Sequence, residues 1–131
     1  MAIDLSRAVQ QASYDALSAG VTLAPVYQHV PDDKRAPYVV IEGSTVTYLG
    51  GKDGGLERHD LSIMTVSREP GRLPVLALQA EVREALNGVP MTAAGADLSA
   101  PEIQSAADQL LDDGLTYVGS QRFTIFAQAA D

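Results

Sequence analysis

The sequence predicts an α+β fold, and three features of the chain support this prediction. Two stretches carry apolar residues at helical spacing, several runs are rich in β-favouring residues, and prolines and glycines separate these runs at short intervals. With 131 residues, of which 46% are hydrophobic, the chain is long enough to form one compact core. We therefore expect residues 1–131 to form a single domain.

An amphipathic helix is expected near the N-terminus, from Asp4 to Ala19. Its apolar stripe lies opposite a polar face and consists of Leu5, Ala8, Val9, Ala12 and Ala16. Asp4 is a suitable N-cap, and Gly20 stands where helices commonly end in left-handed geometry. Both ends of the helix are thus indicated.

The segment from Val26 to Glu42 predicts a β-hairpin. Pro31 ends a short apolar stretch, a charged turn follows at residues 32–35, and Pro37 precedes the apolar run Tyr38 to Ile41. Each proline fixes its own φ and lacks an amide donor, so both are expected at strand ends.

A glycine-rich loop and a central strand are expected next. The loop from Leu49 to Glu57 contains Gly50, Gly51, Lys52, Asp53, Gly54 and Gly55. Because glycine loses much conformational entropy on ordering, we expect this loop to stay mobile until a partner protein contacts it. The following run, His59 to Ser67, has apolar residues on both faces, which is typical of a central strand.

The C-terminal half predicts a second helix and further strands. Pro74 fits a first helical turn, and the helix is expected to end at Asn87-Gly88; its stripe consists of Val75, Leu78, Val82, Ala85 and Leu86. Residues 91–98, with Gly95 in their middle, are consistent with a short hairpin, and residues 117–127 alternate as a closing strand.

Residues 99–113 carry a helical pattern of their own. Ser99 is a suitable N-cap, and Pro101 and Glu102 fit a first turn. Apolar residues then recur at helical spacing, at Ile103, Ala106, Ala107, Leu110 and Leu111. From this pattern alone the segment is predicted to be a third helix.

Composition and motifs argue against most kinds of chemistry. The chain has no cysteine, and its net charge of −8 opposes sequence-independent binding to a phosphate backbone. His29 and His59 lack metal-ligand spacing, so both are interpreted as structural or solvent-facing. The acidic pairs Asp32-Asp33 and Asp112-Asp113 are interpreted as solvated turns rather than acid–base pairs or cation sites. We predict neither an enzyme nor a cofactor or metal site.

Two further classes of function have little support. No serine lies in a nucleophile motif, and the glycine-rich loop lacks the G-K-[ST] ending and following helix of a phosphate-binding loop. No apolar run approaches the ~20 residues that span a bilayer, so we expect a soluble protein made in the cytoplasm. We interpret residues 50–55 as contacts for a protein partner instead.

The order of the elements, together with four motifs, resembles a known family. The motifs are V-Y-x-x-V-P at residues 26–31, P-Y-V-V-I-E at 37–42, the run His59 to Arg68, and D-G-L-T-Y-x-G-x-x-R-F at 113–123. In this order they resemble the tail terminator, or tail completion, proteins of long-tailed phages and gene transfer agents, which are similar to the lambda tail terminator. The resemblance covers nearly the whole chain.

The resemblance implies a fold and a function. The fold would be a mostly antiparallel sheet packed against two helices, with residues 102–111 forming a strand that leads into an acidic turn rather than a helix. The function would be that of a structural virion protein: a homohexameric ring that caps the tail tube, ends tube polymerisation and joins the tail to the head. The implied partners are other copies of the chain, the major tail tube protein and a head-side connector or stopper protein.

The resemblance also has implications for DNA and for the location of the protein, and two alternative functions stand beside it. DNA would pass through the ring without specific binding, past basic residues such as Lys52 or Arg58, and the protein would reside in the tail-neck region of the virion after assembly in the host cytoplasm. The first alternative is another neck or stopper protein on the portal side. The second, from a different class, is a small α+β ligand-binding or enzymatic domain, which a deep pocket with convergent titratable groups would favour.

Overall fold

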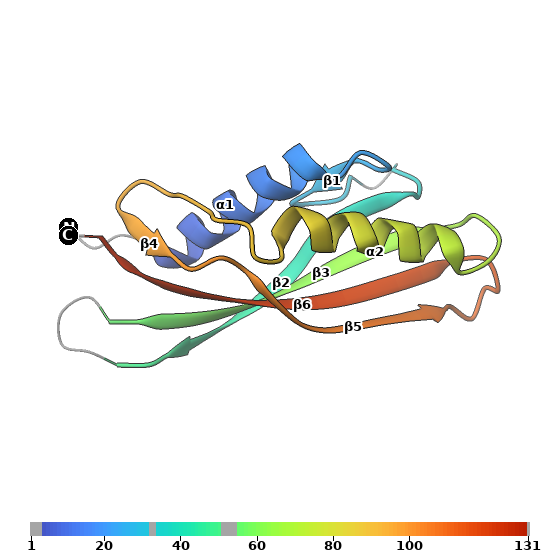
Figure 1. The fold of residues 1–131 in the computed structure, drawn as a ribbon. Helices are drawn as coiled ribbons and strands as arrows, with labels where there is room; N and C mark the ends of the chain where they lie inside the picture. The colour runs from blue at the N-terminus through green and yellow to red at the C-terminus, as the bar shows by residue number, and fades with distance from the viewer. Residues whose placement is uncertain (1–3, 32–33, 51–54, 131) are drawn as a thin grey trace.

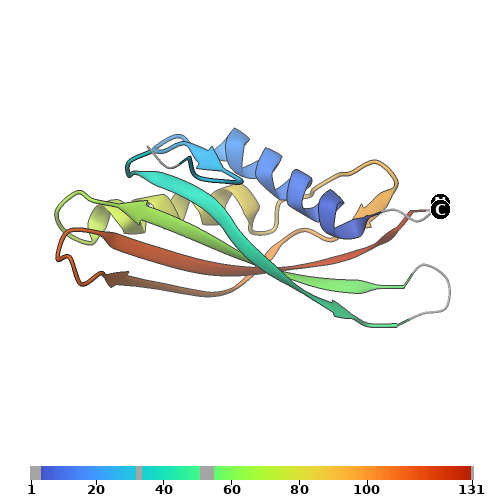
Figure 2. The same ribbon diagram turned by 180° about the vertical axis from the view of Figure 1, so that it is seen from behind.

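The computed structural model describes residues 4–31, 34–50 and 55–130. It contains two helices and six strands, and both helices lie on one face of a long twisted sheet (Figures 1 and 2). In chain order the elements are α1 (Leu5–Gly20), β1 (Val26–Tyr27), β2 (Tyr38–Tyr48), β3 (Glu57–Ser67), α2 (Leu73–Leu86), β4 (Ala96–Leu98), β5 (Glu102–Leu110) and β6 (Tyr117–Ala129). The predicted α+β class is confirmed.

The sheet has the strand order β1-β2-β3-β6-β4, and β5 also pairs with β6. β4 pairs with Ala127–Ala129 and β5 with residues 117–124, so the two strands share one edge of β6. Every ladder is antiparallel except the short one between β1 and β2. The prediction of a central strand at residues 59–67 is confirmed, because β3 lies between β2 and β6.

The first helix begins as predicted but ends differently. The Asp4 carboxylate accepts a hydrogen bond from the Arg7 amide at 3.1 Å, which caps the N-terminus. Gly20 is the last residue of the helix and does not adopt a left-handed φ, so that prediction is wrong. The glycine is required for space instead, because an added Cβ would lie 2.6 Å from the Cβ of Ala85 in α2.

The prediction of a hairpin at residues 26–42 is wrong: the second strand begins at Tyr38, as expected, but the first ends at Tyr27 instead of next to Pro31, and the two run in parallel. Val26 pairs with Val39 and Tyr27 with Val40 in parallel, so β1 and β2 do not form a hairpin. Prolines and a charged turn indicate a break between strands but do not fix the direction of pairing, and ten residues (28–37) allow the chain to loop back to a parallel start. Asp32 and Asp33 lie outside the described residues.

Residues 102–110 form β5, so the helix predicted from their pattern is wrong and the strand implied by the resemblance is confirmed. Ser99 shows why, because it does not cap a helix: its amide donates to the Phe126 carbonyl at 2.9 Å and its Oγ accepts from the Phe126 amide at 2.8 Å. The segment thereby completes the edge of β6. Sheet hydrogen bonding prevails over a helical pattern whose alanines, Ala106 and Ala107, remain exposed.

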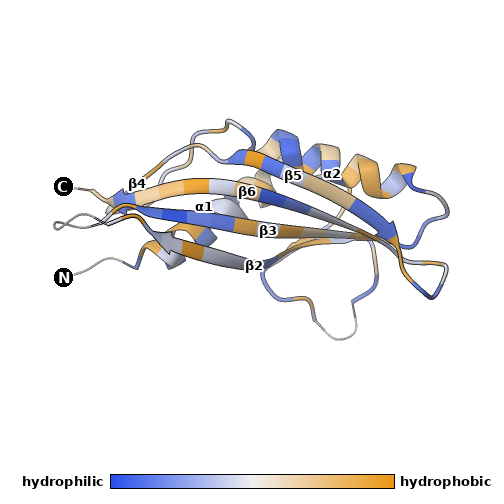
Figure 3. Cartoon of the chain, turned by 90° about the horizontal axis from the view of Figure 1, so that it is seen from below, coloured by the Kyte–Doolittle hydropathy of each residue, from blue (hydrophilic) through white to orange (hydrophobic). Residues whose placement is uncertain are grey.

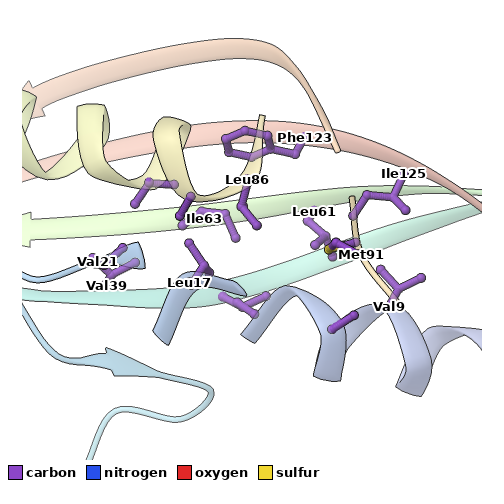
Figure 4. Packing of buried hydrophobic residues seen from close by; sticks show 14 of the residues in the cluster. Val9, Leu17, Val21, Val39, Leu61, Ile63, Leu86, Met91, Phe123 and Ile125 are labelled. Atoms are coloured by element: carbon purple, nitrogen blue, oxygen red, sulfur yellow. The ribbon is translucent and has the colours of Figure 1, made fainter. Parts of the chain in front are cut away.

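The core lies between the helices and the sheet (Figure 4). Leu17 of α1, Leu86 of α2 and Phe123 of β6 are fully buried, and they pack in one cluster with Leu61, Ile63 and Ile125. Alternation along β3 and β6 points every second side chain towards the helices, which is why these two strands supply most of the buried side chains of the sheet. Within the described residues, no helix is long and apolar enough to cross a membrane.

The remaining predictions in the C-terminal half are largely confirmed. α2 has Pro74 in its first turn and is followed by Gly88 with a φ of +73°. Residues 93–96 form one antiparallel bridge, so the expected hairpin at 91–98 is reduced to a tight turn before β4. The closing strand β6 is two residues longer than the expected 117–127.

Candidate interaction surfaces

The hairpin between β2 and β3 extends beyond the helices at one end of the molecule (Figures 1 and 2). The Leu49 amide donates to the Leu56 carbonyl at 2.9 Å, and the Leu56 amide donates to the Gly50 carbonyl at 3.1 Å. Gly50 has a φ of +91°, a geometry that glycine adopts without strain. Of the predicted contact residues, the structure describes Gly50 and Gly55; Gly51, Lys52, Asp53 and Gly54 lie outside the described residues.

Exposed apolar side chains flank this loop. Tyr48 is 77% exposed, Leu49 48% and Leu56 38%. We call the set Tyr48, Leu49, Gly50, Gly55 and Leu56 the hairpin tip. A cluster of large apolar side chains on a projecting hairpin is a common feature of protein-binding surfaces.

The opposite end of the molecule carries a second apolar cluster, in the β5–β6 turn and at the start of α2 (Figure 1). We call it the turn end; it consists of Leu73, Leu110, Leu111 and Leu115, and Leu73 is 78% exposed. The sequence patterns did not predict this cluster. The three leucines around the acidic turn Asp112-Asp113-Gly114 could have indicated it from the sequence, because turns rarely contain so many large apolar residues.

Two polar features hold the turn end in place. The Arg72 guanidinium donates to both carboxylate oxygens of Asp108, at 2.9 and 3.1 Å, which joins the start of α2 to β5. This pairing raises the pKa of Arg72 and lowers that of Asp108. In the turn itself, hydrogen bonds from the Thr116 hydroxyl and from the Leu115 and Thr116 amides lower the pKa of Asp113 to about 2.

The face of the sheet that the helices leave uncovered mixes hydrophilic and hydrophobic residues (Figure 3). Phe126 is 40% exposed there. Beside it, Arg58 forms an ion pair with Asp60 at 3.3 Å, and Asp60 also accepts a hydrogen bond from Thr124 at 2.6 Å. Arg58, named above as a basic residue that could line a channel, therefore has its charge compensated by a neighbour.

The two histidines lie in different environments, and separate grooves lie beside the helices and the β5–β6 turn. His29 is exposed and follows β1 instead of lying in a strand, whereas His59 is fully buried with its Nε2 2.9 Å from Glu57 Oε1. Within residues 4–31, 34–50 and 55–130, no cluster of three potential metal ligands occurs. Two grooves of about 470 and 520 Å³ run between α1 and residues 89–94, and a third, of about 500 Å³, is lined by residues 109–113 at the turn end.

Comparisons with known proteins agree with this architecture. Residues 6–128 match the model of a family described as "Tail completion protein gp17". The structure is similar to a chain from the virion of a native gene transfer agent particle, with a TM-score of 0.84 and 20% identity over 98% of this chain and 100% of the other. At that identity the similarity shows the fold. No curated protein sequence matches the chain.

Proposed function

The chain belongs to the tail completion protein gp17 family and is a structural protein of the virion tail rather than an enzyme; from this premise we propose that six copies form a ring that caps the tail tube. The ring ends tube polymerisation and joins the tail to the head-side connector. The observation that supports this role is the presence of two different apolar clusters at opposite ends of one elongated domain. A joining ring needs two such surfaces.

The two ends differ in chemistry, as the two partners of a joining ring would require. The hairpin tip combines an aromatic ring with leucines and flanking glycines, whereas the turn end combines four leucines with the acidic turn at Asp112 and Asp113. We assign the hairpin tip, together with residues 51–54, to the tail tube side, and the turn end to the connector side. A ring with unlike faces stops growth because its second face does not accept another tube subunit.

DNA passes through the proposed ring without being held. Each copy carries a net charge of −8, so six copies at −8 each carry −48. This charge repels phosphates over about a Debye length, ~8 Å at physiological salt. The ion pair between Arg58 and Asp60 removes one candidate contact for phosphate.

Three matched lysine substitutions separate the two assigned faces. Leu49→Lys is at the hairpin tip and Leu115→Lys at the turn end. Leu23→Lys is the control, because Leu23 is also exposed (56%) but belongs to neither cluster; it lines a groove beside α2 with Pro74 and Leu78. Tail length and the fraction of tails joined to heads are counted by electron microscopy. We expect Leu49→Lys to give overlong, unjoined tails, Leu115→Lys to give unjoined tails of normal length, and Leu23→Lys to give normal particles.

Two outcomes would contradict the proposal. Normal particles for both Leu49→Lys and Leu115→Lys would show that neither end contacts a partner. Tails of normal length but without heads in the complete absence of the protein would place it at the portal-side stopper position instead of the tube end.

A further inference from the structure

The distal half of β2 is an open sheet edge. β1 covers β2 only at Val39 and Val40, where the Val39 amide donates to the Pro25 carbonyl at 2.9 Å. Beyond the bulge between Ile41 and Gly43, the Leu49 amide points to β3, because it donates to Leu56. Amides alternate in direction along a strand, so those of Ser44, Val46 and Tyr48 point away from β3. No strand among the described residues pairs with them.

The distal half of β5 is a second open edge, on the opposite side of the sheet. The Leu111 amide donates to the Thr116 carbonyl, so by the same alternation the amides of Ala106, Asp108 and Leu110 point away from β6. The beginning of β5 is covered, because Asn87 accepts a hydrogen bond from the Ile103 amide at 2.9 Å. Within the described residues, no strand pairs with the outer side of residues 106–110.

Each open run begins after a β-bulge, but neither run contains a lysine or a proline. Natural edges carry lysines, prolines or bulges that prevent pairing, but the run Gly43–Tyr48 contains no charge and no proline. In the open part of β5 the charged residue is Asp108, and its charge is compensated by Arg72. Pairing the two edges therefore brings no like charges together, whereas pairing β5 with itself would bring two Asp108 side chains close.

The directions of the strands also match. Three antiparallel ladders separate β2 from β5 through β3 and β6, so β5 runs opposite to β2. If a second copy continues the sheet, its β5 lies antiparallel to β2 of the first copy. The register in which all outward amides of both edges find a partner pairs Ser44 with Leu110 and Tyr48 with Ala106. In this register Thr47 lies opposite Ala107.

We infer that neighbouring copies join edge to edge, with β2 residues 44–48 of one copy pairing antiparallel with β5 residues 106–110 of the next. This inference rests on the proposed ring and specifies how its subunits meet. The contact is heterologous, since each copy offers two different edges, and such contacts close into rings. Across β3, the open half of β2 is level with β6 residues 123–127, whereas the open half of β5 pairs with β6 residues 117–121. The two open edges therefore lie at different heights along the strands, and copies joined at these edges are staggered. In closed β-structures such stagger accompanies tilted strands.

Disulfide trapping tests this contact, because the chain has no cysteine of its own. Thr47 and Ala107 are both exposed on the helix-free face, and their proposed pairing is the closer, non-hydrogen-bonded type, whose Cα separation of ~4.5 Å suits a disulfide. Tails assembled from the double variant Thr47→Cys, Ala107→Cys are oxidised and run on a denaturing gel. We expect covalent multimers up to the hexamer, and none with either single variant.

The controls separate this inference from the proposed function. The double variant Thr45→Cys, Ala107→Cys tests a pairing register shifted by two residues. A six-fold ring without multimers in either register would overturn the edge pairing and leave the ring intact, whereas tails without any ring of this protein would overturn the proposed function. Dimers from Thr47→Cys alone would show β2 pairing with itself and would also overturn the inference.

A proline substitution provides a second, independent readout. Ser44→Pro removes an outward amide that β3 does not use, whereas Ser44→Thr keeps it. We expect both variants to fold, as judged by circular dichroism, but only Ser44→Thr to enter tails. Incorporation of Ser44→Pro at the level of Ser44→Thr would contradict pairing at this edge.

Discussion

Gly20 and Ala85 bring the two helices so close together that a methyl group on Gly20 would lie 2.6 Å from the Ala85 Cβ. We expect Gly20→Ala to lower the free energy of unfolding by about 1–3 kcal/mol, the usual cost of overpacking, despite the better helix propensity of alanine. Urea denaturation measures the change. The double variant Gly20→Ala, Ala85→Gly should recover part of the loss, and additive effects of the two substitutions would contradict a direct contact.

The acidic turn predicts a pH dependence of stability. Hydrogen bonds lower the pKa of Asp113 from 3.8 to about 2, so its carboxylate stabilises the fold fully above pH 4 and loses this effect as the pH falls towards 2. The wild type should therefore melt at a higher temperature than Asp113→Asn at neutral pH, and the two melting temperatures should converge near pH 2. Asp112→Asn controls for net charge. An equal difference at pH 2 and pH 7 would contradict the role of these hydrogen bonds.

Deleting residues 51–55 should leave the fold intact and impair tail completion. The ladder up to Tyr48 and Glu57 lies outside the deletion, and the remaining residues Leu49, Gly50 and Leu56 can close the hairpin as a three-residue loop, although the hydrogen bond between Leu49 and Leu56 is lost. Circular dichroism checks the fold, and the yield of infectious or DNA-delivering particles checks the function. Normal tail length and normal yield after the deletion would show that this loop contacts no partner.

The free protein should not bind duplex DNA measurably near 150 mM salt. Non-specific DNA-binding proteins typically show dissociation constants of ~10⁻⁴–10⁻⁶ M under such conditions, and their affinity comes from basic residues. This chain has 17 acidic and 9 basic residues, which gives it the opposite charge balance. Fluorescence anisotropy with a labelled duplex measures the binding. Micromolar affinity with a steep salt dependence would indicate a DNA-retaining role at the neck.

Local patterns predicted most of the elements because each carries its own chemical marks. Asp4 and Pro74 mark helix starts, and the alternation of residues 117–127 marks a strand whose every second side chain is buried. The helix pattern at residues 99–113 failed because the edge of β6 offers backbone hydrogen bonds to this segment, and a local pattern contains no information about that edge. Only the family resemblance, which carries tertiary information, indicated a strand there.

The candidate surfaces were predictable only in part. Glycines concentrated in one loop marked the hairpin tip, although four of the six named residues lie outside the described part of the chain. The turn end was missed because Leu73 is far from Leu110 and Leu115 in sequence, and the contacts that join α2 to β5, such as the pairing of Arg72 with Asp108, are tertiary. The open edges of β2 and β5 depend on strand order, which periodicity does not encode.

The most direct test of the proposed ring is a symmetry-free reconstruction of the tail-neck region from purified particles. We expect six copies of this chain in a closed ring at the head-proximal end of the tail tube, with the hairpin tip towards the tube and the turn end towards the connector. A ring of any other symmetry, or a neck that lacks this chain, would contradict it.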